Sequence, residues 1–443
     1  MAYIYRTLAA NNQKKLTISA WVKLAKIQEQ GIINNYYSGS YWAQLYFNSS
    51  GHLIFADYRT SYILQLQSTE SFKDVGSWYH VVANFDCSIG SPTAKLYVNG
   101  SEVKYSSQTI YSQNATTSWN TDYIFNVGRG TNLGGNDFDG VMSDVYFIQG
   151  YTYDASTFGE TDATTGEWKP ITSPTINYGG TGGNSCHLKF ENSANMDLDS
   201  GSNNISFTTS GTLTQTKDNP SNNFATFNSL TSNNPTLSGA NLIATASGGY
   251  RYALSTIAPT TGKYYAEFKL TTDSGYTNFG VENLSKGGFS TQYNSNSYIG
   301  EYNSGVAYQP GSSSLYHNGS SSGSYGGAAN GDVIGIAMDL DNGFIYWSKN
   351  GTFLNSGVPT SAGTGTGGYA ISNIANTTGT NNYAMGVSLA NTGGGRSISA
   401  NFGNGYFGTT AISSAGSNAS NVGLFEYDVP AGYTALSTTG LNK

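Results

Sequence analysis

The sequence predicts an all-β protein made of two antiparallel β-sandwich domains in tandem. Three observations predict this fold class: apolar and polar residues alternate with a period of two, Asn-Gly pairs recur, and helical periodicity is nearly absent. The alternation is clearest over residues 16–22, 78–85, 263–270 and 334–340. In each segment one face would pack against a core, and the other would meet solvent or a second sheet.

The Asn-Gly pairs predict tight hairpins, because both residues tolerate the positive φ that a two-residue reversal needs. They occur at 99–100, 318–319, 330–331, 342–343, 350–351 and 404–405. We therefore expect a hairpin over 95–105 and a short strand over 344–348.

Composition excludes several classes of function. Charged residues make up 11% of the 443 residues, against roughly 25% in ordinary globular domains. The net charge of −7 and the lack of a basic run argue against a nucleic-acid partner. No apolar run is long enough to insert into a membrane, and the N-terminus lacks a secretory signal. Cys87 and Cys186 form neither a disulfide framework nor a zinc site, and their spacing leaves open whether they pair.

Shifts in composition suggest where the domains end. Residues 1–160 and 236–443 carry the strand signals. Between them, residues 161–235 are predicted to be a partly structured connector, because the Gly-rich stretch 179–183 resembles a flexible joint. A short strand is expected near 187–190, within that connector.

The first domain resembles the LamG-like members of the concanavalin A-like lectin/glucanase superfamily. The matching segments are 16–22 (LTISAWV), 78–82 (WYHVV), 95–100 (KLYVNG) and 138–145 (FDGVMSDV). The resemblance implies a jelly-roll sandwich of two antiparallel sheets.

The second domain resembles the SPRY/B30.2 family over about 255–440. The matching segments are 262–267 (GKYYAE), 331–340 (GDVIGIAMDL), 344–351 (FIYWSKNG) and 430–433 (PAGY). A LamG-like domain followed by a SPRY-like one is similar to structural proteins predicted for marine bacteriophages. The segments 5–7 (YRT), 158–162 (FGETD), 187–190 (HLKF) and 218–223 (DNPSNN) share that similarity. It implies a place on a virion surface more than it implies a ligand.

The pattern of acidic residues argues against catalysis. Retaining glycosidases need two carboxylates roughly 5 Å apart, and the glucanases that share the first domain's fold carry a Glu-x-Asp-x-x-Glu strand. The nearest approach here is Glu160 and Asp162, with Glu167 beyond a predicted turn. We therefore expect no catalytic residues, and a glycan hydrolase is the least favoured reading.

The sequence predicts no cofactor and no metal site. Some LamG-like domains hold calcium at the rim of the sandwich, and Asp137, Asp139 and Asp144 are the weak calcium candidates that this resemblance implies.

Aromatic residues in loops are the candidate ligand-binding residues, since they anchor many interfaces. They form one group in each domain: Tyr36, Tyr37, Tyr41 and Trp42 in the first, and Tyr293, Tyr302, Tyr308, Tyr316 and Tyr325 in the second. The alternative is that many of them are core residues of a Tyr-rich sandwich.

The favoured function is a non-catalytic virion appendage, such as a tail fibre, spike or head fibre. It would dock on other virion proteins, form a homo-oligomer and present loops to a host-surface polysaccharide or protein. Such a protein would be made in the host cytoplasm without a signal peptide and end on the virion surface. The alternative is a purely architectural capsid decoration, cement or tail-associated protein without a host ligand.

Overall fold

A computed structural model of the chain describes residues 2–130, 136–179, 183–231, 233–246, 248–272, 275–286, 297–377, 379–391 and 395–443. Two compact units divide the chain, residues 1–215 and 216–443. Each unit is a β-sandwich, so the predicted fold class is confirmed. Over the described residues, helix is confined to short turns, and none is long and apolar enough to cross a membrane.

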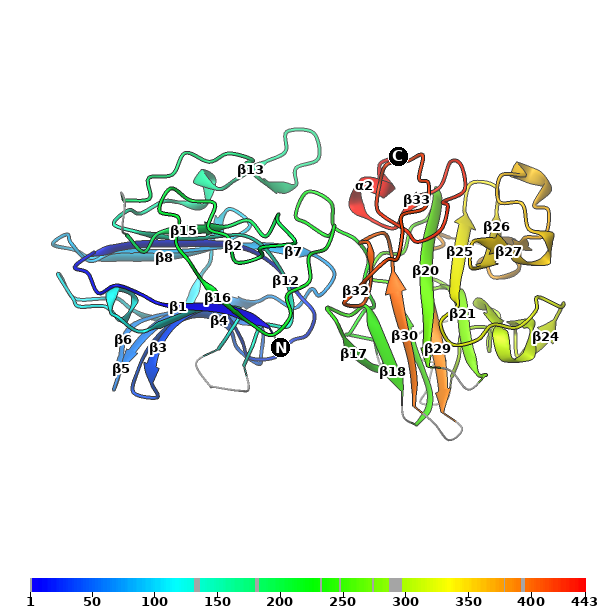
Figure 1. The fold of residues 1–443 in the computed structure, drawn as a ribbon, viewed down its shortest axis with the longest axis horizontal. Helices are drawn as coiled ribbons and strands as arrows, with labels where there is room; N and C mark the ends of the chain where they lie inside the picture. The colour runs from blue at the N-terminus through cyan, green and yellow to red at the C-terminus, as the bar shows by residue number, and fades with distance from the viewer. Residues whose placement is uncertain are drawn as a thin grey trace. The chain divides into compact units, whose positions relative to one another are not determined.

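Two sheets pack face to face in the first unit (Figure 1). Over the described residues, the large sheet has the strand order β10–β6–β5–β4–β3–β11–β1–β16, and the small sheet has the order β15–β12–β2–β7–β8–β9. The strands of the large sheet are β10 (Tyr105–Thr109), β6 (Tyr62–Ser71), β5 (His52–Arg59), β4 (Tyr41–Phe47), β3 (Gln30–Ser38), β11 (Ile124–Val127), β1 (Tyr3–Thr7) and β16 (Thr208–Ser210). Those of the small sheet are β15 (Cys186–Leu188), β12 (Gly140–Gln149), β2 (Lys15–Leu24), β7 (Trp78–Asp86), β8 (Thr93–Val98) and β9 (Ser101–Glu102). The short 3-10 turns are η1 (Ser118–Asn120) and η2 (Ala155–Thr157).

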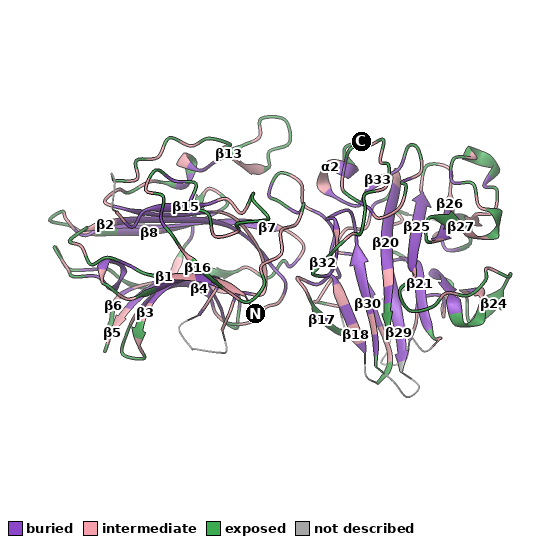
Figure 2. Cartoon of the chain, viewed as in Figure 1, coloured by how far each residue is buried: buried purple, intermediate pink, exposed green. Residues whose placement is uncertain are grey.

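The core of the first unit lies between the inner faces of these two sheets (Figure 2). Leu16 and Ile18 of β2 and Val81 of β7 face Leu45 of β4 and Phe55 of β5, and all five side chains are fully buried. Their alternation along each strand is the period-two signal of the sequence. It fixes the register because a slip by one residue would move these side chains from the core to the opposite face of the sheet.

The outer face of the small sheet is buried as well, which the alternation does not predict. Residues 151–178, which include the β13–β14 hairpin (Gly159–Thr161 and Trp168–Pro170), run over this face. Phe158 packs against Tyr146 of β12, and the Thr17 hydroxyl of β2 donates to the backbone of Tyr151. Every residue of β2 from Leu16 to Leu24 is therefore buried.

The segment expected to be a connector is divided between the two units. β15 extends the small sheet beside β12, and β16 extends the large sheet beside β1, so residues up to 215 belong to the first unit. Phe224 and Phe227 are buried in the cores of the second unit. Strands of three residues have no periodicity of their own, and only their distant partners define them.

The second unit also stacks two sheets. Over the described residues, one has the order β17–β18–β30–β20–β25–β26–β27, with β28 beside β26 and β33 beside β20, and the other has the order β19–β29–β21–β22–β23–β24. Strands of the first sheet are β17 (Thr236–Ser238), β18 (Ile243–Ala246), β30 (Arg396–Asn401), β20 (Lys263–Thr272), β25 (Val333–Asp339), β26 (Phe344–Lys349), β27 (Thr352–Phe353), β28 (Tyr369–Ala370) and β33 (Thr434–Ala435). Strands of the second are β19 (Gly249–Leu254), β29 (Tyr383–Asn391), β21 (Thr277–Asn283), β22 (Gly305–Gln309), β23 (Ser314–His317) and β24 (Ser320–Ser322). The remaining elements are β31 (Tyr406–Phe407), β32 (Thr410–Ala411), η3 (Pro310–Ser312), η4 (Leu354–Ser356), η5 (Ala362–Thr364), η6 (Ile371–Asn373) and α2 (Thr438–Leu441).

The Asn-Gly pairs form tight turns where they close a hairpin. Asn99-Gly100, Asn318-Gly319 and Asn350-Gly351 take positive φ at both residues, and they join β8 to β9, β23 to β24 and β26 to β27. These turns confirm the predicted hairpin over 95–105, and β26 confirms the predicted strand over 344–348.

Both cysteines are buried and free. Burial raises the pKa of the Cys87 thiol and that of the Cys186 thiol above the usual value. Neither residue forms a disulfide, which answers the question that their spacing left open.

A buried carboxylate ties the C-terminal segment of the second unit to its central strand. Glu267 of β20 is fully buried, and its two oxygens accept the backbone N–H groups of Glu426 and Tyr427, each at 2.8 Å. The hydroxyl of Tyr265 and the amide of Asn401 lie at 3.3 and 3.4 Å from the same carboxylate. Burial nevertheless outweighs these four donors and raises the pKa of Glu267 to about 7.

The raised pKa of Glu267 predicts how the stability of the second unit depends on pH. Between pH 4.5 and about 7 the folded chain holds a proton that the unfolded chain has lost. The free energy of unfolding should therefore fall by about 3 kcal/mol as the pH rises across this window, and then level off. Trp347 is the tryptophan of the second unit, so its ¹⁹F resonance in 5-fluorotryptophan-labelled protein can follow urea unfolding at each pH.

The Glu267→Gln variant should lack this component of the pH dependence, because its side chain does not titrate. Glu426→Gln is the control, since the Glu426 carboxylate accepts the Ser413 N–H at 3.2 Å and its charge is the smallest of the effects on the pKa of Glu267. A wild-type chain whose pH profile matches that of Glu267→Gln would show that Glu267 titrates normally.

Candidate functional site

Exposed apolar side chains gather at one end of the large sheet of the first unit. Tyr37 is 67% exposed, Tyr41 38%, Tyr62 37% and Ile124 47%. We call this surface the aromatic rim and define it by eight residues: Tyr36, Tyr37, Tyr41, Trp42, Tyr58, Tyr62, Tyr123 and Ile124. Exposed apolar clusters are uncommon on soluble proteins and often mark a binding surface.

Strand pairing places part of the aromatic rim in one row across the outer face of the large sheet. Trp42 of β4 lies opposite Tyr36 of β3 and Tyr58 of β5, Tyr58 lies opposite Tyr62 of β6, and Tyr36 lies opposite Ile124 of β11. The rings of Trp42 and Tyr58 stack with centroids 5.5 Å apart, and Tyr62 meets both rings edge-on. Cross-strand aromatic pairs of this kind stabilise a sheet, so these rings also have a structural role.

The remaining rings lie around the β3–β4 turn. Tyr37 stacks on Tyr123 with centroids 5.0 Å apart and an interplanar angle of 24°, and Tyr41 meets Tyr37 edge-on at 6.5 Å. The stack leaves most of Tyr37 in solvent while it fixes the plane of the ring. This is how an aromatic anchor is held ready for a ligand at low entropic cost.

A buried polar network supports the strands behind the aromatic rim. Asp57 of β5 is fully buried, and its Oδ2 atom accepts the Tyr111 hydroxyl and the Ser118 backbone N–H, both at 2.7 Å. Arg59 Nε donates to Ser118 Oγ at 3.0 Å, and its charge favours the ionised form of Asp57. Burial is the largest effect, and it raises the pKa of Asp57.

A serine–histidine pair lies on the outer face of the small sheet. It resembles a catalytic pair, but its hydrogen bond runs in the opposite direction. Ser19 Oγ lies 2.8 Å from His80 Nε2, and Trp168 Nε1 lies 3.0 Å from His80 Nδ1. An indole N–H can only donate, so Nδ1 is the acceptor and Nε2 carries the proton of the neutral ring. His80 therefore donates to Ser19 and cannot remove its proton, which is what nucleophilic catalysis requires. Burial lowers the pKa of His80 to about 3 and keeps the ring neutral.

The three calcium candidates each face a basic side chain. Asp137 lies 3.8 Å from Arg129, Asp139 lies 2.8 Å from Lys26, and Asp144 lies 3.1 Å from His187. Asp144 sits at a β-bulge of β12 with a φ of 49°, which turns its carboxylate toward β15. Over the described residues, no three His, Cys, Asp or Glu side chains gather as a metal site would require.

The acidic string that most resembles a glucanase motif is part of the β13–β14 hairpin. Lys169 Nζ lies 3.0 Å from Asp162 and 3.6 Å from Glu160, and Asp162 also accepts the backbone N–H groups of Thr164 and Thr165. These hydrogen bonds lower the pKa of Asp162, so it stays ionised as a turn-capping group.

The described candidate tyrosines of the second unit are buried or half-buried. Tyr308 is fully buried and donates to Gly326 O at 2.7 Å, and Tyr325 packs against the core beside it. Tyr302 is half-buried against a small apolar cluster, and Tyr316 is half-buried beside Tyr298. Tyr293 lies outside the described residues.

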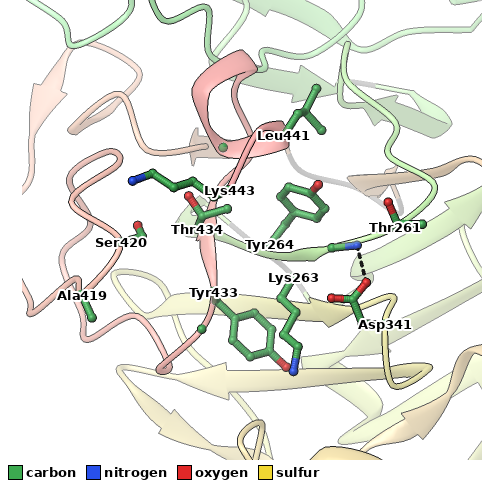
Figure 3. Close-up of a pocket in the computed structure, with 13 residues that line it drawn as sticks. Thr261, Lys263, Tyr264, Asp341, Ala419, Ser420, Tyr433, Thr434, Leu441 and Lys443 are labelled. Atoms are coloured by element: carbon green, nitrogen blue, oxygen red, sulfur yellow. Dashed lines mark hydrogen bonds between the residues drawn. The ribbon is translucent and has the colours of Figure 1, made fainter.

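The second unit also has a pocket of about 440 Å³ between the start of β20, the loop after β25 and the C-terminal segment (Figure 3). Two of the charged residues that line it contact their own fold: Lys263 Nζ lies 3.0 Å from the buried Asp339, and Asp341 accepts the Gly262 N–H at 2.7 Å. Tyr264 and Tyr433 line the pocket but are almost fully buried. These two contacts join the start of β20 to the end of β25 and the loop after it.

Sequence reasoning found half of the aromatic rim and missed Tyr58, Tyr62, Tyr123 and Ile124. Tyr58 and Tyr62 carry a readable signal, since they flank the 59–61 turn as Tyr36 and Trp42 flank the turn before them. Tyr123 and Ile124 carry none, because only the pairing of β11 with β3 brings them to the rim.

Comparison with known families finds a match within the first unit. Residues 2–153 match the concanavalin A-like lectin/glucanases superfamily. This concanavalin A-like match covers the part of the chain for which the sequence showed that resemblance. The comparison with curated proteins finds no match.

Solved structures similar to this chain include domains of the SPRY type. The SPRY domain of human HERC1 is 21% identical, with a TM-score of 0.27, and the match covers 36% of this chain and 87% of that one. The PSpry domain of TRIM65 is 16% identical, with a TM-score of 0.28, and the match covers 40% and 91%. A heptameric SAP-like pentraxin from Limulus polyphemus is 18% identical, with a TM-score of 0.25, and the match covers 33% and 69%.

The hydrogen bonds of His80 predict which tautomer its ring adopts, and NMR can test this. Of the four histidines, His80 should stay neutral, with its proton on Nε2, down to about pH 4, because burial opposes the charged ring. Long-range ¹H–¹⁵N spectra of histidine-labelled protein report both the tautomer and the titration, and His80→Gln assigns the signal. A proton on Nδ1, or titration near pH 6.5, would contradict the hydrogen-bond directions given above.

Proposed function

We propose that this chain is a non-catalytic component of a bacteriophage virion that attaches the particle to the surface of its host. The aromatic rim supports attachment, since it combines an exposed, preorganised Tyr37 with neighbouring exposed rings in a chain with few charges. The similarity of the sequence to predicted phage structural proteins supports the place on a virion. The His80 tautomer supports the non-catalytic assignment, because His80 cannot take the proton of Ser19 as a base.

The attachment works through many weak contacts. One rim buries little surface, so a single copy binds weakly. A homo-oligomer docked on other virion proteins presents several rims at once, and linked weak sites gain avidity without any new contact. No step requires a calcium ion or another cofactor.

Labelling and competition on intact particles test this function. Antibodies against the chain should decorate the virion in electron micrographs, and purified chain added in excess should slow adsorption of the phage to its host. Chain that covers the capsid in a regular lattice, with adsorption unaffected by the competitor, would instead favour a purely architectural decoration. Release of reducing sugars from host polysaccharide would contradict the non-catalytic assignment.

A further inference from the structure

We infer that the aromatic rim binds a neutral glycan chain and does so without a metal ion. This inference rests on the proposed attachment function and names the class of ligand that its site recognises. The area, the charges and the ring geometry of the rim each support it.

The exposed area of the rim suits a glycan better than a protein. An aromatic side chain offers roughly 150–250 Å² of surface, so the three most exposed rings of the rim, Tyr37, Tyr41 and Tyr62, expose about 200–350 Å². Ile124 and the half-buried rings add to this area. A stable protein interface buries about 800 Å² on each partner. A chain of a few sugar rings needs a much smaller contact area. The strength of attachment then increases with the number of rims that bind at once.

The charges around the rim favour a neutral ligand over an acidic one. Arg59 is the basic side chain beside the rim, and it contacts Ser118 and balances the buried Asp57. The acidic residues near the rim are Asp122, which is exposed next to Tyr123, and Glu29, whose charge reaches Tyr62. A uronate or sialylated chain would meet these carboxylates, and the Nη2 atom of Arg59, which has no hydrogen-bond partner, is buried out of its reach. Neutral sugars are therefore favoured.

The geometry of Tyr37 provides the stacking platform. One face of its ring rests on Tyr123, and the ring is two-thirds exposed, so the other face can lie against the apolar C–H face of a pyranose. Ser38, Ser40 and Thr60, from the turns on either side of Tyr41, place hydroxyl and backbone groups nearby for hydrogen bonds to sugar hydroxyls. Over the described residues, no acidic cluster at the rim could hold a bridging cation.

Binding of the full chain to defined oligosaccharides tests the inference. The neutral probes are maltohexaose, cellohexaose and mannohexaose, followed by an array of neutral glycans, and hexagalacturonate is the acidic probe. The purified chain should bind at least one neutral glycan with a Kd between about 10⁻⁴ and 10⁻³ M, equally well with and without EDTA. Hexagalacturonate should bind at least tenfold more weakly.

Single-residue variants test whether the binding depends on the rim. Tyr37→Ala should raise the Kd at least tenfold, and Tyr37→Phe should change it less than threefold, because the ring and not the hydroxyl makes the stack. Tyr276→Ala removes a tyrosine of the second unit that is 45% exposed, and it should leave the Kd unchanged. Tyr37 is largely in solvent, so circular dichroism should show the same melting curve for all of these variants as for the wild type.

Binding to host cells separates failure of this inference from failure of the proposed function. A chain that attaches to cells but to no neutral glycan overturns the glycan inference and leaves attachment standing. Equal binding by wild type and Tyr37→Ala, preference for the acidic probe, or loss of binding in EDTA would each overturn it as well. A chain that attaches to no host cell and does not slow adsorption overturns the proposed function itself.

Discussion

The covering of the small sheet by residues 151–178 determines what the first unit can present to its surroundings. Trp168 donates to His80 from this cover, and Phe158 packs on Tyr146, so polar and apolar contacts hold the cover together. A sheet that is buried on both faces can bind nothing on either of them. The only sheet face that displays a cluster of exposed rings in the described part of this unit is therefore that of the large sheet.

The two units use aromatic residues in different ways, although each contains 17 tyrosines. In the second unit Tyr308 fills the core and Tyr265 contacts the buried Glu267, so the rings there stabilise the sandwich. In the first unit the rings around the β3–β4 turn lie at the end of the sheet, outside the hydrophobic core. The aromatic rim therefore lies on the unit whose residues 2–153 match the concanavalin A-like superfamily.

The sequence predicts the strands well because their signals are local. Alternation within β2, β7, β20 and β25 and the Asn-Gly turns depend on residues that are neighbours in the chain. The burial of Ser19 and Thr17 does not follow from alternation, because it depends on a cover that comes far later in the sequence. The candidate site divides in the same way: Tyr37 and Tyr308 have the same side chain, but the structure leaves Tyr37 exposed and buries Tyr308.

The two buried thiols have a consequence for the conditions that the protein can withstand. Reaction with oxidants requires the thiolate, and burial keeps Cys87 and Cys186 in the protonated form. Neither unit gains stability from a covalent link between these cysteines, so their packing is the same in a reducing and in an oxidising medium. Neither unit therefore needs a redox-dependent step that joins these two cysteines in order to reach its folded state.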